Sequence, residues 1–445
     1  MIDNNIFIDK KVIFHTLGCK LNFAETSAIG KQLSDEGFVK AKPGEQADVC
    51  IINTCSVTDT ADHKCRQAIN RLNRQHPKAL MIVTGCYAQL KPEEIAAIEG
   101  VDMVLGANEK FSIAEYLRNL EDNNSTEIHH TDINKVREFK PSVSRDDRTR
   151  YFLKVQDGCD YFCTYCTIPF ARGRSRNANI DQTVAAAKDA IKNGAKEIVL
   201  TGINIGDFGK STDENFFDLV KALDALDNEV RFRISSIEPN LLTDEMIHFI
   251  ATSKHFMPHF HIPLQSGTNE VLQVMKRKYS RELFQHKVET IKRLIPHAFI
   301  GVDVIVGVRG ETDELFDQSY QFIESLDISQ LHVFTYSERQ GTKMLDIEHS
   351  VLLKERKRRS EVLHALSEIK TQTFYESQRG KTYPALWESR HNGEQMVGFT
   401  SNYIRVEKPY DKNSVNCIEI ITLGSWNEEK SALKAASEGE LYILD

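Results

Sequence analysis

The sequence lacks long apolar runs, and this absence narrows the class of protein. None of its hydrophobic stretches approaches the length needed to span a bilayer, which excludes a transmembrane helix. The N-terminus, MIDNNIFIDKKVIF, lacks the basic start, apolar core and small-residue cleavage site of a signal peptide. We therefore expect a cytoplasmic protein with no membrane partner.

An excess of positive charge is also missing. The chain carries 56 basic against 64 acidic side chains, a formal net charge of −8. Overall charge thus gives no sign of a nucleic-acid-binding protein. Any contact with RNA would depend on local basic patches, because phosphate contacts act at short range in salt.

The chain is long and contains several cysteines. Its 445 residues exceed what one hydrophobic core usually serves, so we expect two or three domains. Nine cysteines in a reducing compartment favour metal binding or catalysis over a disulfide framework.

The pattern of apolar runs divides an α/β chain into successive regions. Residues 9–121 alternate short apolar runs with helical patterns, which predicts a parallel sheet with crossover helices. Residues 122–148 are polar and read as a linker, although the second half fits an irregular extension packed on a domain equally well.

Two further domains follow. Residues 149–376 contain six strand–helix units, which predict a partial (βα)6 barrel of the TIM type. Residues 378–445 contain short strands separated by turn residues, which predict a small antiparallel β-barrel. The strands predicted there are Tyr383–Trp387, Met396–Phe399, Tyr403–Val406, Ile418–Ile421 and Leu441–Leu444.

Three cysteines of the first domain each follow a predicted strand. Cys19, Cys55 and Cys86 are about one βα unit apart. Because the carboxyl ends of parallel strands share one edge of a sheet, the three thiols can converge there. Thiolate is the ligand for iron–sulfur clusters and for zinc, and both remain open at this position.

A compact cysteine motif opens the second domain. Cys159, Cys163 and Cys166 supply three thiolates from one loop, with C-x3-C-x2-C spacing. A four-iron cluster held by three thiolates keeps one iron without a protein ligand, and that iron can bind a cofactor or substrate. No fourth ligand sits at the short spacing that a closed zinc site would need.

The compact motif resembles the signature of the radical S-adenosylmethionine superfamily. The resemblance implies a 4Fe-4S cluster whose open iron chelates S-adenosylmethionine, with Tyr165 near the adenine. It also loosely matches cofactor-binding segments at the strand ends. The residues implied there are Thr201, Gly202, Ser236, Gln265 and Gly307. Gly307-Val-Arg-Gly-Glu-Thr312 departs from the usual Gly-Phe-Pro-Gly-Glu-Thr of that superfamily.

The order of the domains resembles the methylthiotransferases over nearly the whole chain. That family implies a second, auxiliary 4Fe-4S cluster on Cys19, Cys55 and Cys86. The segment Thr16-Leu-Gly-Cys19-Lys-Leu-Asn22 is most similar to the MtaB branch, which modifies N6-threonylcarbamoyladenosine at position 37 of tRNA. Alternatives are methylthiolation of isopentenyladenosine, as in the MiaB branch, or of a ribosomal-protein aspartate, as in the RimO branch. A non-catalytic iron–sulfur protein that binds tRNA is an alternative of another class.

The C-terminal barrel resembles the RNA-binding TRAM domain. The resemblance implies tRNA as a partner, through its anticodon stem-loop, together with an electron donor and a sulfur source. Basic residues beside the cysteine loop and in the barrel are the RNA-binding candidates, although most such residues are simply solvated. These candidates are Arg172, Arg174, Arg379 and Arg405.

Overall fold

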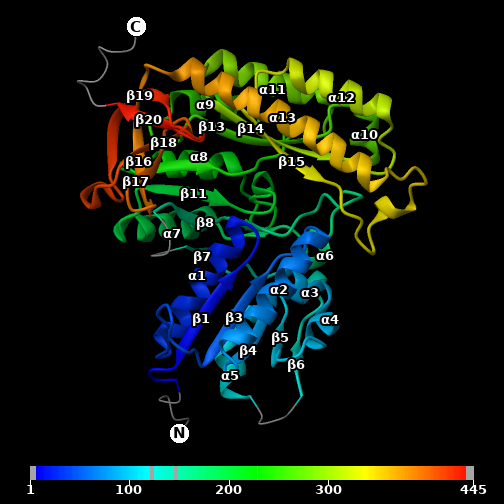
Figure 1. Cartoon of the computed structure of the whole chain (residues 1–445), viewed down its shortest axis with the longest axis vertical. Helices are drawn as coiled ribbons and strands as arrows, with labels where there is room; N and C mark the ends of the chain where they lie inside the picture. The colour runs from blue at the N-terminus through cyan, green and yellow to red at the C-terminus, as the bar shows by residue number, and fades with distance from the viewer. Residues whose placement is uncertain (1–6, 121–124, 145–148, 228, 437–445) are drawn as a thin grey trace.

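The computed structural model describes residues 7–120, 125–144, 149–227 and 229–436 (Figure 1). An N-terminal sheet domain lies below a larger central barrel, and a small barrel, drawn in orange and red, lies beside one end of the central part. Helix α1 (Lys20–Asp35) packs against strand β8 (Tyr151–Lys154) of the central part. Within these ranges, no helix is long and apolar enough to cross a bilayer.

The N-terminal domain is built on a six-stranded parallel sheet, in the order β2-β1-β3-β4-β5-β6. Its central strand β3 is buried at every position, as in parallel sheets covered on both faces. This confirms the parallel sheet predicted from the sequence. The strands are β1 (Lys11–Thr16), β2 (Val39–Lys40), β3 (Val49–Thr54), β4 (Leu80–Gly85), β5 (Met103–Leu105) and β6 (Glu127–His129). The other helices here are α2 (Asp59–Gln75), α3 (Cys86–Leu90), α4 (Pro92–Ala96) and α5 (Ile113–Arg118).

The central part contains six parallel strands. Three of them pair in the order β12-β11-β8 and three in the order β13-β14-β15, and a bridge from Ser236 to His261 joins the two sets. This arrangement confirms the partial barrel. The strands after β8 are β11 (Glu197–Thr201), β12 (Arg231–Ile234), β13 (His259–Gln265), β14 (Phe299–Val306) and β15 (Gln330–Thr335). The helices are α6 (Ile168–Arg172), α7 (Ile180–Lys192), α8 (Phe216–Asp224), α9 (Asp244–Thr252), α10 (Asn269–Val274), α11 (Arg281–Leu294), α12 (Asp313–Ser325) and α13 (Leu353–Gln378).

Parts of the segment expected to be a linker, 122–148, are regular structure. Strand β6 pairs with β5 at the edge of the N-terminal sheet. Strand β7 (Ser142–Val143) pairs antiparallel with β8, as an extension packed on the central domain would. Both pairings provide hydrogen-bond partners for backbone groups that an edge strand otherwise leaves unpaired. Polar side chains do not prevent such backbone pairing, so a polar segment can still form a strand.

The C-terminal part is a closed barrel in the order β16-β17-β18-β20-β19. Trp387 is fully buried in its core. The pairs are antiparallel except for β18 with β20, which run parallel. The expected strand Leu441–Leu444 lies outside the described residues, and the fifth strand is a segment that the sequence analysis missed. The strands are β16 (Thr382–His391), β17 (Gln395–Thr400), β18 (Arg405–Pro409), β19 (Ile418–Trp426) and β20 (Leu433–Ala436).

Candidate metal centres

The first three cysteines meet at one edge of the N-terminal sheet. Cys19, Cys55 and Cys86 follow β1, β3 and β4, which are neighbours in the sheet. The turn before Cys19 lies directly against Cys55, because a Cβ added to Gly18 would sit 2.7 Å from the Cβ of Cys55. Gly18 has a φ of +100°, a conformation that glycine adopts without strain.

The electrostatics of this trio suit a bound metal. Burial raises the pKa of the Cys55 thiol to about 12, and the neighbouring thiols Cys86 and Cys19 add to the rise. Burial also raises the pKa of Cys86, while the Arg172 guanidinium opposes that rise. Thiols that disfavour each other's ionisation in this way become thiolates when a metal supplies positive charge.

The donor set of each trio fits a cluster with an open iron. Each trio offers three thiolates, one fewer than the four ligands of a closed zinc site, and three thiolates leave one iron of a four-iron cluster without a protein ligand.

The second trio lies in the loop between β9 (Gln156–Asp157) and α6. Each sulfur accepts one hydrogen bond, from the Tyr161 amide to Cys159 at 3.4 Å, from the Ile168 amide to Cys166 at 3.4 Å and from Arg277 Nη1 to Cys163 at 3.1 Å. Such donors stabilise thiolates that bind a cluster. The three side chains therefore fit the expected donor set.

The two trios lie next to each other across the domain interface. Thr167, which follows Cys166, donates from its hydroxyl to the backbone oxygen of Ser56 at 3.4 Å, and Ser56 follows Cys55. Helices α3 and α6, which adjoin the two trios, also pack together. The fold therefore brings two separate thiol sites to one interface.

The expected cofactor-binding residues occupy the strand ends, with different surroundings. Thr201 is buried at the end of β11 and Ser236 follows β12 at its bridge to His261. The space beside Gly202 is filled by Gln156, whose Oε1 would lie 2.9 Å from an added Cβ. Gly307, with a φ of +75°, leaves room for the Arg356 side chain, 2.3 Å from the position of an added Cβ. At both positions the neighbouring atoms leave no room for a side chain, so packing alone explains the glycine.

Orphaned polar atoms mark where a polar ligand fits. Gln265 has a φ of +66°, and its buried Oε1 has no hydrogen-bond partner in the part of the chain described. Asn204 Oδ1 is also buried without a partner there. Tyr165, beside Cys166, accepts a hydrogen bond at its hydroxyl from Arg277 at 3.4 Å. Buried atoms of this kind are costly unless a ligand or water pairs with them, so the residues present fit S-adenosylmethionine.

Arg172 does not have the surroundings of an RNA-binding residue. Its side chain is 2% exposed and its guanidinium is occupied by Glu25, Asp157 and Asn22, at 2.5–3.1 Å. In this structure Arg172 is therefore not accessible to RNA, contrary to expectation, because its charge is buried between α1 and the cysteine loop. The position of Arg172 beside the cysteine motif reflects its place in the domain interface.

The other arginine candidates are exposed. The Arg174 side chain is 55% exposed, and its guanidinium lies over the Phe162 ring at 4.7 Å. Arg379 pairs with Glu376 at the end of α13. Arg405 lies on the barrel surface and lines two hollows there. Arg174 also pairs with Asp160 at 3.5 Å. All three guanidinium groups are accessible to solvent and therefore to a phosphate group.

Sequence reasoning missed Arg277 and Glu238. Arg277 follows α10, Glu238 follows β12, and the two side chains form an ion pair beside Cys163. A basic run, Lys276-Arg277-Lys278, was visible, but it did not show which of the three would turn inward. Only Arg277 does so, with a side chain 3% exposed.

Comparisons with known proteins agree with this architecture. Residues 153–323 match the model of the radical SAM superfamily, and residues 11–106 match that of the uncharacterized protein family UPF0004. The tryptophan-bound methyltransferase TsrM of Kitasatospora setae superposes with a TM-score of 0.55 over 73% of each chain, at 14% identity, which shows a shared fold.

Relatives over nearly the whole length are more specific. The threonylcarbamoyladenosine tRNA methylthiotransferase MtaB of Bacillus subtilis (strain 168) is 40% identical over 89% of both chains. The MtaB protein of Aquifex aeolicus (strain VF5) is 35% identical over 89% of this chain and 96% of its own. The tRNA-2-methylthio-N(6)-dimethylallyladenosine synthase of Desulfitobacterium hafniense (strain Y51) is 31% identical over 90% of this chain and 92% of its own. The chain belongs to the radical S-adenosylmethionine methylthiotransferase family.

Proposed function

We propose that this protein is a tRNA methylthiotransferase that converts N6-threonylcarbamoyladenosine beside the anticodon to its 2-methylthio derivative. The observation that carries the proposal is the adjacency of two cysteine trios, linked by the hydrogen bond from Thr167 to Ser56. Relatives of both adenosine-modifying branches support tRNA as the substrate, and the MtaB name of the first relatives supports the threonylcarbamoyl form.

The chemistry explains why two sites are needed. When bound, the two 4Fe-4S clusters and S-adenosylmethionine supply a carbon radical and a sulfur donor, which together functionalise a C–H bond that no base can deprotonate. Cys159, Cys163 and Cys166 would hold one cluster, and Cys19, Cys55 and Cys86 the other. The reaction consumes electrons and sulfur, so we include an electron donor and a sulfur source among the partners.

A group of charged residues at the domain interface lies between the two cysteine trios. Arg172, Glu25 and Asp157 form a buried ionic network between α1 and the cysteine loop. These ion pairs join the two elements at 3.0–3.1 Å, and breaking buried pairs of this kind is costly. We propose that the network fixes the distance between the trios, while Asn204 and Gln265 bind the polar groups of S-adenosylmethionine.

Arg174, Arg379 and Arg405 are proposed to contact tRNA phosphates. Their exposure supports this role, and Phe162 and Phe170 beside Arg174 add aromatic surface for base stacking. Phe170 is 45% exposed, so its ring is accessible for such stacking.

The test is the nucleoside profile of tRNA from a strain in which the gene is deleted. We expect loss of 2-methylthio-N6-threonylcarbamoyladenosine, measured by mass spectrometry, and its return on complementation. Loss of the isopentenyl derivative would indicate the MiaB-type substrate. An unchanged profile would contradict a tRNA substrate and favour either a protein substrate or a non-catalytic role.

Two cysteine variants separate the proposed sites. Cys163→Ala should abolish formation of 5′-deoxyadenosine, whereas Cys55→Ala should retain it and still fail to restore the modified nucleoside. Cys417→Ala is the matched control, because Cys417 is exposed and remote from both trios in the sequence. Full complementation by Cys55→Ala would remove the N-terminal trio from the mechanism.

A further inference from the structure

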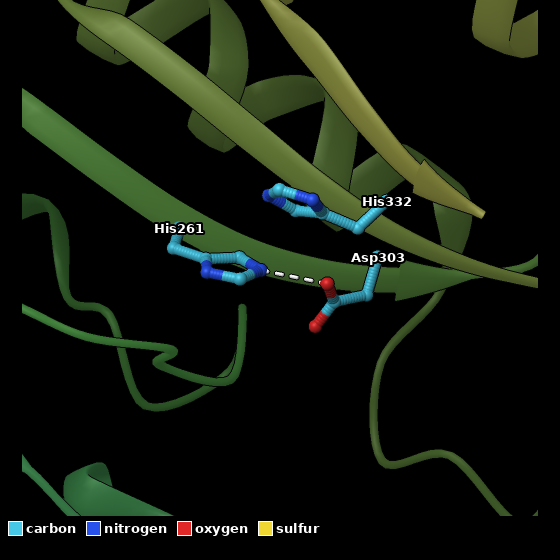
Figure 2. Close-up of side chains that lie close together, drawn as sticks. All are labelled: His261, Asp303 and His332. Carbon is cyan, nitrogen blue, oxygen red and sulfur yellow. Dashed lines mark hydrogen bonds and ion pairs between the residues drawn. The ribbon is translucent and has the colours of Figure 1, made fainter. Parts of the chain in front are cut away.

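Two histidines and an aspartate form a compact group on one face of the central sheet. His261, Asp303 and His332 project from the neighbouring strands β13, β14 and β15 (Figure 2). One ligand atom of each side chain lies within 4.8 Å of the ligand atoms of the other two. The two imidazole rings have centroids 4.9 Å apart. The group shares no residue with the cysteine trios, and the proposed function gives it no role.

The register of the sheet explains why the three side chains converge. Asp303 pairs directly with His332 between β14 and β15, and directly paired residues point to the same face of a sheet. His261 pairs with Gly301, two residues before Asp303 in β14. Val302, between these two, points the other way and is buried in the hydrophobic core. The group therefore lies on the face opposite that core, toward the barrel interior.

A glycine in the middle of β14 leaves room beside the group. A Cβ added to Gly301 would lie 3.6 Å from Nε2 of His332, so a larger side chain there would press on this ring. The backbone of Gly301 does not require glycine, because its φ is not positive. Glycine inside a strand weakens the strand and often marks a place where a ligand approaches closely.

The group also has ligand atoms to spare. Within the described chain, His332 makes no hydrogen bond through either ring nitrogen. Nε2 of His261 lies 2.7 Å from Oδ1 of Asp303, and no lysine or arginine of the described chain forms an ion pair with this carboxylate. The His261 and Asp303 side chains are 19% and 18% exposed, so an ion can reach them. Polar groups buried to this degree are costly when they lack partners, which favours a bound ligand.

The donor set identifies the kind of ligand. Two imidazoles and one carboxylate bind zinc or non-haem iron(II) and leave further coordination positions open. Ligand atoms about 2.1 Å from one ion are about 3.0–3.4 Å apart. The contact between His261 and Asp303 is shorter because a proton lies between the two atoms, and an entering ion displaces that proton. The His332 ring can turn toward the same ion, because the second side-chain torsion of histidine is broad.

We propose that His261, Asp303 and His332 bind one divalent transition-metal ion, in addition to the two iron–sulfur clusters. The open coordination positions of this ion face the barrel interior, where they can accept an oxygen or nitrogen atom of the substrate. Ser236, expected at the S-adenosylmethionine site, forms a β-bridge with His261, so the ion lies beside that site. The inference does not depend on which nucleoside is modified.

The test adds Zn²⁺ alone to the anaerobically reconstituted protein and measures zinc, iron and sulfide after free ions are removed. We expect one equivalent of bound zinc. Its X-ray absorption should show only nitrogen and oxygen ligands at about 2.0–2.1 Å, whereas zinc on a cysteine trio would show sulfur at about 2.3 Å. His332→Gln and Asp303→Asn should each weaken zinc binding at least about a hundredfold, since even the partners of metal ligands contribute about 10- to 100-fold. Iron and sulfide should stay unchanged in both variants.

Two further variants of the design separate metal binding from damage to the fold. Asp303→Asn keeps the shape of the native side chain, so it decides the outcome alone if His332→Gln fails to fold. His286→Gln is the matched control, because His286 also pairs with a carboxylate, that of Asp244 at 2.8 Å, but is exposed on α11 and lies outside the group. This variant should bind zinc like the wild type.

Four results would overturn the inference. The first two are a wild type that binds no zinc and a bound zinc with sulfur ligands. The third is a zinc equivalent that both site variants retain. The fourth is loss of cluster iron together with zinc in both variants, because the proposed site shares no ligand with the clusters.

Discussion

Arg277 donates from Nη1 to Sγ of Cys163 across 3.1 Å, and its Nη2 pairs with Glu238. The side chain is 3% exposed, so its positive charge acts on the thiol without screening by water. Hydrogen bonds and positive charge at a cluster sulfur raise the reduction potential of the cluster. We infer that Arg277 is a positioning residue that adjusts the cluster proposed on Cys159, Cys163 and Cys166.

Replacing Arg277 by Met should therefore make the midpoint potential of that cluster more negative. Cleavage of S-adenosylmethionine should slow at least about tenfold, which is the usual loss of activity when a hydrogen-bond partner of a metal ligand is replaced. A redox titration followed by electron paramagnetic resonance measures the potential. Arg281→Met, at a partly exposed arginine that begins α11, should change neither quantity. An unchanged potential at full iron content in Arg277→Met would contradict this role.

Glu25 is the second testable position. Its carboxylate is fully buried and contacts Lys110, Lys154 and Arg172. Glu25→Gln leaves three buried cations with too little negative charge, which we expect to cost about 3–5 kcal/mol of unfolding free energy. Urea unfolding followed by circular dichroism, with hydrogen exchange of the α1 amides, measures the loss. Glu36→Gln, which breaks a partly exposed pair with Arg118, should cost no more than about 1 kcal/mol.

The same network predicts how acid affects stability. Burial would raise the pKa of Glu25, but Arg172, Lys110 and Lys154 hold it well below the ordinary value. A carboxyl group with a lowered pKa in the fold stabilises it above the unfolded pKa and loses that contribution as pH falls. The α1 amides should thus lose exchange protection as the pH is lowered below about 4.5. Glu25→Gln should flatten that dependence, and an unaltered pH profile would contradict the assignment.

The sequence predicts a site when a local rule relates the positions of its residues along the chain. Cys159, Cys163 and Cys166 lie in one short loop, so their spacing alone indicates a shared site. Cys19, Cys55 and Cys86 could be placed because parallel strands end at one edge of the sheet. In both cases a local rule gives the position of the side chain.

Long-range contacts were not predictable in this way. Arg172 meets Glu25 across 147 residues of sequence, and nothing near either residue marks the partner. Strand β20 was missed because its four residues, LKAA, show no clear β pattern, and its pairing with β18 and β19 creates it.

Gln265 tests the proposed cofactor contact. Its left-handed backbone, with a φ of +66°, is costly for any residue but glycine. Gln265→Gly therefore keeps the backbone shape and removes the side chain with its orphaned Oε1. We expect the dissociation constant for S-adenosylmethionine to rise about tenfold, with no loss of unfolding free energy. Calorimetric titration of the reconstituted protein measures the dissociation constant. An unchanged affinity would exclude Gln265 from the site.

The last prediction separates two arginines that are two residues apart. Arg174 is exposed over Phe162, whereas Arg172 is buried in the ionic network. Arg174→Met should weaken tRNA binding several-fold and reduce the slope of log affinity against log salt by about 0.7–0.9, the value for one lost phosphate contact. The unfolding free energy should stay the same.

Arg172→Met should have the opposite profile. Removing the guanidinium leaves Glu25 and Asp157 short of a cation, so we expect a loss of about 3 kcal/mol in unfolding free energy. The salt slope of tRNA binding by the folded protein should not change, because no phosphate contact is lost. A reduced slope in Arg172→Met, with wild-type stability, would mean that the interface opens and that Arg172 meets RNA after all. The paired measurement thus decides which arginine beside the cysteine loop faces the nucleic acid.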